Sequence, residues 1–139
     1  MQSQLIGGNY SEAIRKVSGV VDCPIEYIED LGGAKGQCNF STIKVLKGMS
    51  EAQTLKTLLH ETAHFLLHKD CSTTKELAEV EAESVAYVVS NWLGLDASDY
   101  SFGYVLGWGS KLSIEDSKET FKRISKCSKC IIDKIEDTN

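Results

Sequence analysis

Apolar residues recur at helical spacing over two long segments, residues 50–68 and residues 74–93. The first segment is apolar around much of its circumference, which predicts a central and buried helix. Ser50 is a favourable N-cap, and Gln53 three residues later matches a capping box. Gly94 is expected to end the second helix, because glycine readily adopts the left-handed conformation of a C-cap.

Two further segments are amphipathic and flank this pair of helices along the chain. Residues 10–21 predict a short first helix, and residues 113–135 predict a longer last helix. The expected apolar side of the last helix comprises Phe121, Ile124, Ile131 and Ile135.

Three short segments have the character of β-strands. Residues 24–29 alternate between apolar and polar, and residues 42–47 are rich in β-branched side chains. Residues 37–40 lie between them, after a glycine-rich turn. Their short connections predict a small three-stranded antiparallel sheet. Together with the helices, this sheet predicts one α+β domain over residues 1–139.

Composition and charge argue against nucleic-acid-binding, membrane-spanning and secreted proteins. The formal net charge of −5 argues against direct binding of nucleic acid, which favours an excess of lysine and arginine. No window approaches the ~18 apolar residues of a membrane span, and residues 1–4 do not begin a signal peptide. Five scattered cysteines then indicate reduced thiols in a cytoplasmic protein. The CxxC of Cys127 and Cys130 lies within a helical pattern and is interpreted as structural.

The strongest chemical signal is the motif HExxH, formed by residues 60–64 within the predicted central helix. Residues four apart differ by about 40° around a helix, so His60 and His64 can converge on one metal ion. Glu61 then lies beside the metal-bound water and can accept its proton, since zinc lowers the pKa of that water to around 7. All three histidines of the chain fall within residues 60–68, which makes a chance match improbable.

A catalytic zinc needs a third protein ligand, for which the next helix offers Glu79, Glu81 and Glu83. The expected inward stripe of that helix comprises Leu77, Val85, Val88 and Trp92. Glu81 lies on this stripe, where a carboxylate needs a cation. We therefore predict Glu81 as the third ligand, with Glu83 as the alternative. Glu79 is assigned to a solvated acidic face.

Two other residues are candidates for a supporting role. His68 follows His64 by one turn, but three ligands along one straight helix would span about 12 Å, too far for one ion. His68 is therefore either a donor to the transition state or a helix-end residue favoured by the helix dipole. Residues 96–109 predict a loop with a short helical piece, in which Tyr104 is a second candidate donor to an oxyanion.

A resemblance to a known family is carried by TLKTLLHETAHFLLHKD and by ELAEVEAESVAYVVSNWLGLDASDYSFGYVLGW. These stretches resemble the ImmA/IrrE-type zincin-like metallopeptidases, in particular the domain of the ArdC antirestriction and LtrC-like group of conjugative elements. The preceding stretch GGAKGQCNFSTIKVLKGMSEAQ is similar as well. The resemblance extends over residues 24–108.

The resemblance implies a minimal zincin-like fold, in which the small sheet packs on the motif helix and the glutamate helix. The third ligand of the family maps onto the Glu81-Ala82 step. Characterised relatives cleave a partner transcriptional repressor at one site. The ArdC and LtrC relatives also carry an N-terminal single-stranded-DNA-binding domain, so this chain is expected to be a stand-alone version or a piece of a longer protein.

The sequence therefore predicts a zinc-dependent endopeptidase that binds one zinc ion per chain. Its substrate would be a protein linked to a mobile element or its host, bound as an extended strand along the sheet edge. No membrane partner is expected. The alternative is a non-catalytic zinc-binding interaction module with an antirestriction or conjugation-related role. Fe(II) accepts the same ligand set as zinc.

Overall fold

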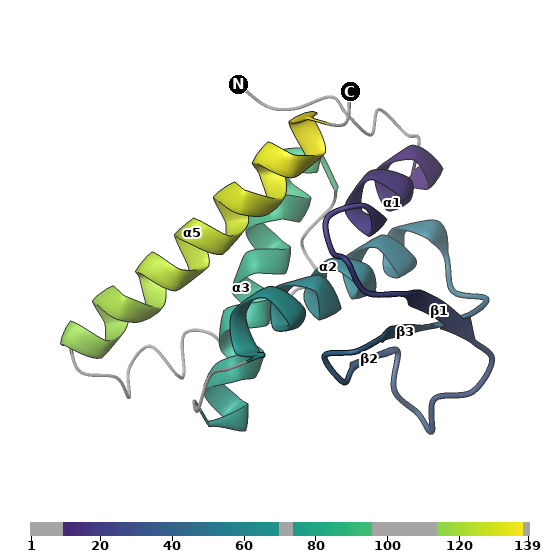
Figure 1. The fold of residues 1–139 in the computed structure, drawn as a ribbon, viewed down its shortest axis with the longest axis horizontal. Coiled ribbons are helices and arrows are strands. Elements are labelled where there is room, and N and C mark those ends of the chain that lie inside the picture. Colours follow the sequence, from purple (N-terminus) through teal and green to yellow (C-terminus); the bar gives the residue numbers. More distant parts are fainter. Residues whose placement is uncertain (1–9, 70–73, 96–113, 138–139) are drawn as a thin grey trace.

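The computed structural model describes residues 10–69, 74–95 and 114–137. In chain order, the described elements are α1 (Tyr10–Ser18), β1 (Ile25–Ile28), β2 (Gly36–Cys38), β3 (Ile43–Leu46), α2 (Glu51–His68), α3 (Lys75–Leu93) and α5 (Ile114–Asp137). The α+β prediction is confirmed for these residues (Figure 1).

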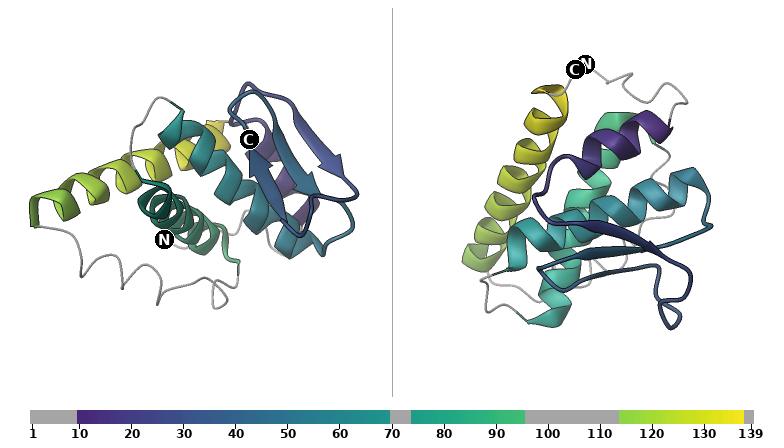
Figure 2. Two further views of the ribbon diagram at one scale, coloured as in Figure 1. Left: turned by 90° about the horizontal axis from the view of Figure 1, so that it is seen from below. Right: turned by 45° about the vertical axis from the view of Figure 1, so that its right-hand side comes forward.

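Helix α2 is the centre of the arrangement. The sheet packs against one side of α2, while α3 and α5 lie on the other side and α1 covers its N-terminal half (Figures 1 and 2). Leu55, Leu58 and Leu59 of α2 have no exposed surface. This burial explains why the sequence of α2 is apolar around most of its circumference.

The sheet is mixed, so the prediction of an antiparallel sheet was wrong. Its strand order is β1-β3-β2, with β3 parallel to β1 and antiparallel to β2. The short connections suggested that each strand pairs with the next in sequence. Instead β3 takes the central position, because Ile43 and Val45 form the most apolar strand face and are completely buried. The edge strand β2 consequently lies over α2.

The helix boundaries follow the predicted caps closely. The Ser50 hydroxyl accepts a hydrogen bond from the Gln53 amide at 3.1 Å, and the Thr74 hydroxyl accepts one from the Leu77 amide at 3.2 Å. Gly94 ends α3 with φ of 89°, as predicted. These local signals need no tertiary contact, which is why the sequence places both helices correctly.

Two predicted apolar faces were partly wrong. Phe121 is 69% exposed, and Val88 is 39% exposed. The buried face of α5 runs instead through Thr120, Ile124, Cys127, Ile131 and Ile135. Each of these residues follows the previous one by three or four positions, and Phe121 lies about 80° around the helix from the centre of that face.

Candidate metal centre

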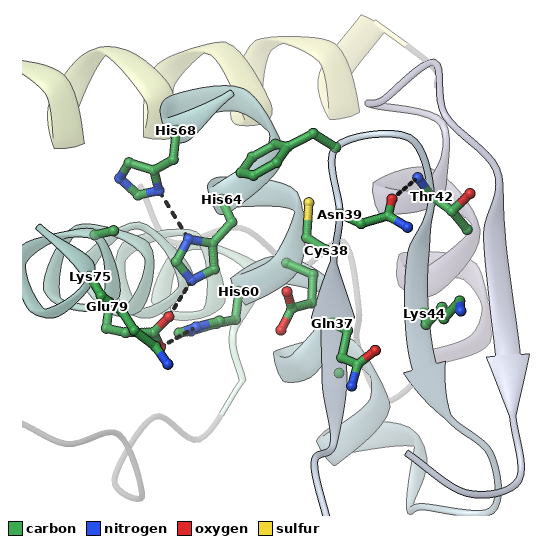
Figure 3. A pocket seen from close by; sticks show the side chains of 14 residues that line it. Gln37, Cys38, Asn39, Thr42, Lys44, His60, His64, His68, Lys75 and Glu79 are labelled. Atoms are coloured by element: carbon green, nitrogen blue, oxygen red, sulfur yellow. Dashed lines mark hydrogen bonds and ion pairs between the residues drawn. The ribbon is translucent and has the colours of Figure 1, made fainter. Parts of the chain in front are cut away.

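The three residues predicted from HExxH lie in the second half of α2. His60 and His64 are half-buried, and Glu61 is buried with 8% of its surface exposed. All three line a cavity of about 640 Å³. In Figure 3 the histidines lie on one side of this cavity, with Gln37 and Cys38 of strand β2 opposite. The structure therefore brings the predicted histidines and glutamate to one open site.

The carboxylate that joins the two histidines belongs to Glu79 of α3. Its Oε1 lies 3.2 Å from Nε2 of His60, and its Oε2 lies 2.7 Å from Nε2 of His64. One ligand atom from each of these three residues can be chosen so that all lie within 4.8 Å of one another. Glu79 is thus a metal-ligand candidate that the sequence assigned to a solvated face.

The predicted ligand Glu81 lies elsewhere. Its side chain is completely buried, as the helical phase predicted. Its Oε1 lies 2.9 Å from Nε2 of His68, and its Oε2 accepts a hydrogen bond from Nε of Arg123 at 2.9 Å. The cation expected beside this buried carboxylate is therefore the guanidinium of Arg123 on α5. The group formed by His60, His64 and Glu79 does not include Glu81.

The alternative ligand Glu83 lies behind His60. Its Oε1 lies 3.0 Å from Nδ1 of His60, on the opposite side of the ring from Glu79. Glu79 and Glu83 are four residues apart and so share one face of α3. The contact suits an outer partner, which accepts the Nδ1 proton of a histidine and leaves its Nε2 lone pair for a metal ion.

The two carboxylates beside His60 strongly favour its charged form. Burial lowers the pKa of His60, but the hydrogen bonds to Glu79 and Glu83, with the nearby charge of Glu61, raise it to about 10. The hydrogen bonds to His60 and His64 hold the pKa of Glu79 far below its usual range. Both pKa shifts include the effect of the same hydrogen bond between His60 and Glu79. The site thus attracts positive charge, and a metal ion would replace the proton on His60.

His64 is the start of a chain of polar contacts that leads away from the cavity. Nδ1 of His64 lies 2.9 Å from Nδ1 of His68, which continues to Glu81 and Arg123. Burial acts to raise the pKa of Glu81, but the hydrogen bonds from His68 and Arg123 outweigh it, and the net shift is downward. Glu81 therefore remains a carboxylate that can only accept hydrogen bonds.

The remaining group, Glu61, lies beneath strand β2. Burial raises the pKa of Glu61, with a smaller contribution from Glu79, whereas His60 and His64 act to lower it. A raised pKa makes this carboxylate a better proton acceptor. The side chain of Glu61 also packs closely against strand β2, because a Cβ atom placed on Gly36 would lie 3.0 Å from its Oε2.

We expect Gly36→Ala to destabilise the protein and to displace Glu61. The added Cβ would lie 2.6 Å from Cγ2 of Thr57 and 3.0 Å from Cγ of Glu61, so the strand or the helix must shift. Overpacking of this kind lowers the free energy of unfolding by about 1–3 kcal/mol. Chemical denaturation measures this loss. Gly19→Ala is the matched control, since its Cβ would meet backbone oxygens at an ordinary 3.5 Å.

The donor set fits a zinc ion. Two imidazoles and one carboxylate form a known catalytic zinc set, which leaves the fourth position open. Bonds of 2.0–2.1 Å to a tetrahedral zinc place ligand atoms about 3.3 Å apart, so the observed separations need only small side-chain rotations. Each histidine offers Nε2 to the centre and has an outer partner on Nδ1.

The other sequence predictions bear less on this site. Tyr104 and the predicted loop of residues 96–109 lie outside the described residues. Cys127 is buried and Cys130 is exposed, and neither forms a disulfide with another cysteine of the described part. Across the described ranges, no helix combines the length and apolar character needed to cross a membrane.

Comparisons of the chain with family models, with curated proteins and with solved structures found no match. The site geometry and the sequence motif are therefore the observations that bear on function.

Proposed function

We propose that this protein is a zinc-dependent metallopeptidase whose zinc is held by His60, His64 and Glu79. The observation that carries the proposal is the convergence of one carboxylate on the Nε2 atoms of both HExxH histidines. Glu61 follows the first of these histidines and lines the same cavity. A chance match to HExxH would not by itself bring one carboxylate to the Nε2 atoms of both histidines.

The zinc ion and the protein side chains would contribute different steps to peptide hydrolysis. Zinc, when bound, would polarise the scissile carbonyl and lower the pKa of a water molecule. Glu61 accepts the proton of the attacking water at its carboxylate and later delivers it to the nitrogen of the leaving amine. Glu83 and His68 hold the rings of His60 and His64 in place through their Nδ1 atoms.

The substrate would bind as an extended peptide along strand β2. This strand is at the edge of the sheet, and residues 36–40 line the cavity opposite the histidines. An edge strand offers backbone N–H and C=O groups to a further strand. A peptide added there would run past Glu61, which lies directly beneath Gly36.

The proposal includes the family placement suggested by the sequence. The motif residues 60–64 and the following glutamate helix resemble the ImmA/IrrE-type zincin-like metallopeptidases, and an α+β arrangement with a small sheet on the motif helix agrees with that resemblance. The substrate would then be a protein regulator linked to a mobile element. A single partner protein, cleaved at one site, is the expected kind of substrate.

The test is the metal content of the purified protein, measured by inductively coupled plasma mass spectrometry. We expect about one zinc per chain in the wild type and a loss of this zinc in His64→Ala, since a catalytic site needs three protein ligands. Thr54→Ala on the same helix is the control and should keep its zinc. If the wild type takes up no zinc when the ion is supplied at neutral pH, the metallopeptidase proposal fails.

A further inference from the structure

A chain of polar side chains, of which Glu81 and His68 are buried, connects the last helix to the candidate metal centre. Arg123 of α5 donates to Glu81 of α3, Glu81 contacts His68 at the end of α2, and His68 contacts His64. Nε and Nη2 of Arg123 both donate to Oε2 of Glu81, and His68 contacts its Oε1, so both carboxylate oxygens are occupied. The side chain of His68 is 6% exposed and that of Glu81 is 0% exposed.

The hydrogen-bonding capacity of these groups limits where the hydrogens can lie. An ionised Glu81 can only accept, so Nε2 of His68 must carry a hydrogen and donate it to Oε1. Nδ1 of His68 lies 2.9 Å from Nδ1 of His64, so one hydrogen lies between these two nitrogens. A metal ion on Nε2 of His64 would require this hydrogen to be on Nδ1 of His64, with Nδ1 of His68 as its acceptor. Nε2 of His64 lies 2.7 Å from Oε2 of Glu79, and a metal ion would replace the hydrogen between these two atoms.

We infer that His68, Glu81 and Arg123 are positioning residues that hold His64 in the tautomer needed to bind metal through Nε2. The inference rests on the proposed function, because it assigns a role toward the same zinc ion. A metal-binding histidine commonly donates its second N–H to a carboxylate or carbonyl. Here the acceptor is a second histidine, whose own tautomer is imposed by a buried carboxylate.

The arrangement also gives a role to the ion pair between Arg123 and Glu81. Glu81 is completely buried whereas the side chain of Arg123 is 36% exposed, and burying a carboxylate costs free energy even beside a cation. Arg123 and Glu81 link α5 to α3 at the level of His68, at the end of the motif helix. We assign this pair a role in orienting His64.

The affinity for Zn²⁺ tests this inference in competition with a chromophoric chelator. Loss of an outer partner weakens metal binding by about 10–100-fold, so we expect this loss in His68→Leu. His68→Asn should recover most of the affinity, because its Oδ1 occupies the position of Nδ1 and can accept from His64. Arg123→Met should also weaken binding, whereas Lys122→Met, the neighbouring change on the exposed side, should not.

Two results would overturn the inference while leaving the metal site in place. One is wild-type zinc affinity in His68→Leu and Arg123→Met. The other is an equal loss in His68→Leu and His68→Asn, since a histidine needed only for packing would not be rescued by an acceptor. Circular dichroism of each variant shows whether it is folded.

A second measurement decides the inference even if the wild type binds no zinc. Two-bond ¹H–¹⁵N spectra report which ring nitrogen carries the hydrogen, and the chain has only three histidines to assign. In the wild type we expect a hydrogen on Nε2 of His68, where Glu81 accepts it, and in Glu81→Leu we expect that preference to disappear. A wild-type His68 whose Nε2 carries no hydrogen contradicts the inference. Absence of zinc binding contradicts the proposed function alone.

Discussion

Glu61→Gln is expected to reduce peptide hydrolysis by about 10²–10⁴-fold, the usual contribution of a general base. The amide of glutamine has nearly the same shape as the carboxylate but cannot accept the proton of the attacking water. Glu61 is not among the residues that converge as metal ligands, so the zinc content should remain that of the wild type. Cleavage of a fluorescence-quenched peptide library and mass spectrometry of bound metal measure the two effects.

The control for Glu61→Gln is Glu51→Gln at the exposed start of the same helix, which should leave both measurements unchanged. A folded, zinc-loaded Glu61→Gln protein that still cleaves the library would contradict the role of Glu61. If a biological activity of the chain survives the change while hydrolysis is lost, the domain acts as a zinc-binding interaction module, the alternative that the sequence left open.

Glu79→Ala is expected to weaken zinc binding by more than the ~10–100-fold that loss of an outer partner causes. Glu79 is the one carboxylate that contacts Nε2 of both His60 and His64 among the described residues. Removing it leaves two ligands, too few for a stable catalytic zinc. Glu83→Ala, which removes an outer partner of His60, should cause the smaller loss. Competition titration with a chelator measures both.

The matched control is Glu76→Ala, an exposed glutamate one turn earlier on α3, which should bind zinc as the wild type does. The comparison also decides between Glu79 and the residue that the sequence favoured. If Glu79→Ala binds zinc normally and Glu81→Ala loses it completely, Glu81 is the ligand and the side chains must rearrange when metal binds.

The sequence by itself determined helix α2, which carries the HExxH residues. Capping by Ser50, the apolar pattern of α2 and the spacing of His60 and His64 are local properties, because each depends on residues within a few turns of one helix. The structure keeps all of them and places Glu61 in the same cavity. Only the tertiary structure shows that this cavity is closed on one side by strand β2.

The strand order is a case in which local pattern was insufficient. The alternation of residues 24–29 and the β-branched character of residues 42–47 predict strands, but neither pattern contains the direction of a neighbouring strand. That direction follows from which strand takes the central position. Ile43 and Val45 bury completely against α2, so β3 became the centre and β1 had to pair with it in parallel.

The proposed third ligand, Glu79, could not be predicted from the sequence for the same reason. Helical phase correctly predicted that Glu81 is buried, and a buried carboxylate does need a cation. The cation is Arg123, 42 residues away on a helix whose position no local pattern reveals. Glu79 looked solvated because its face of α3 is polar, yet that face crosses α2 at His60 and His64. A single helix shows which residues point the same way, and only packing decides what they point at.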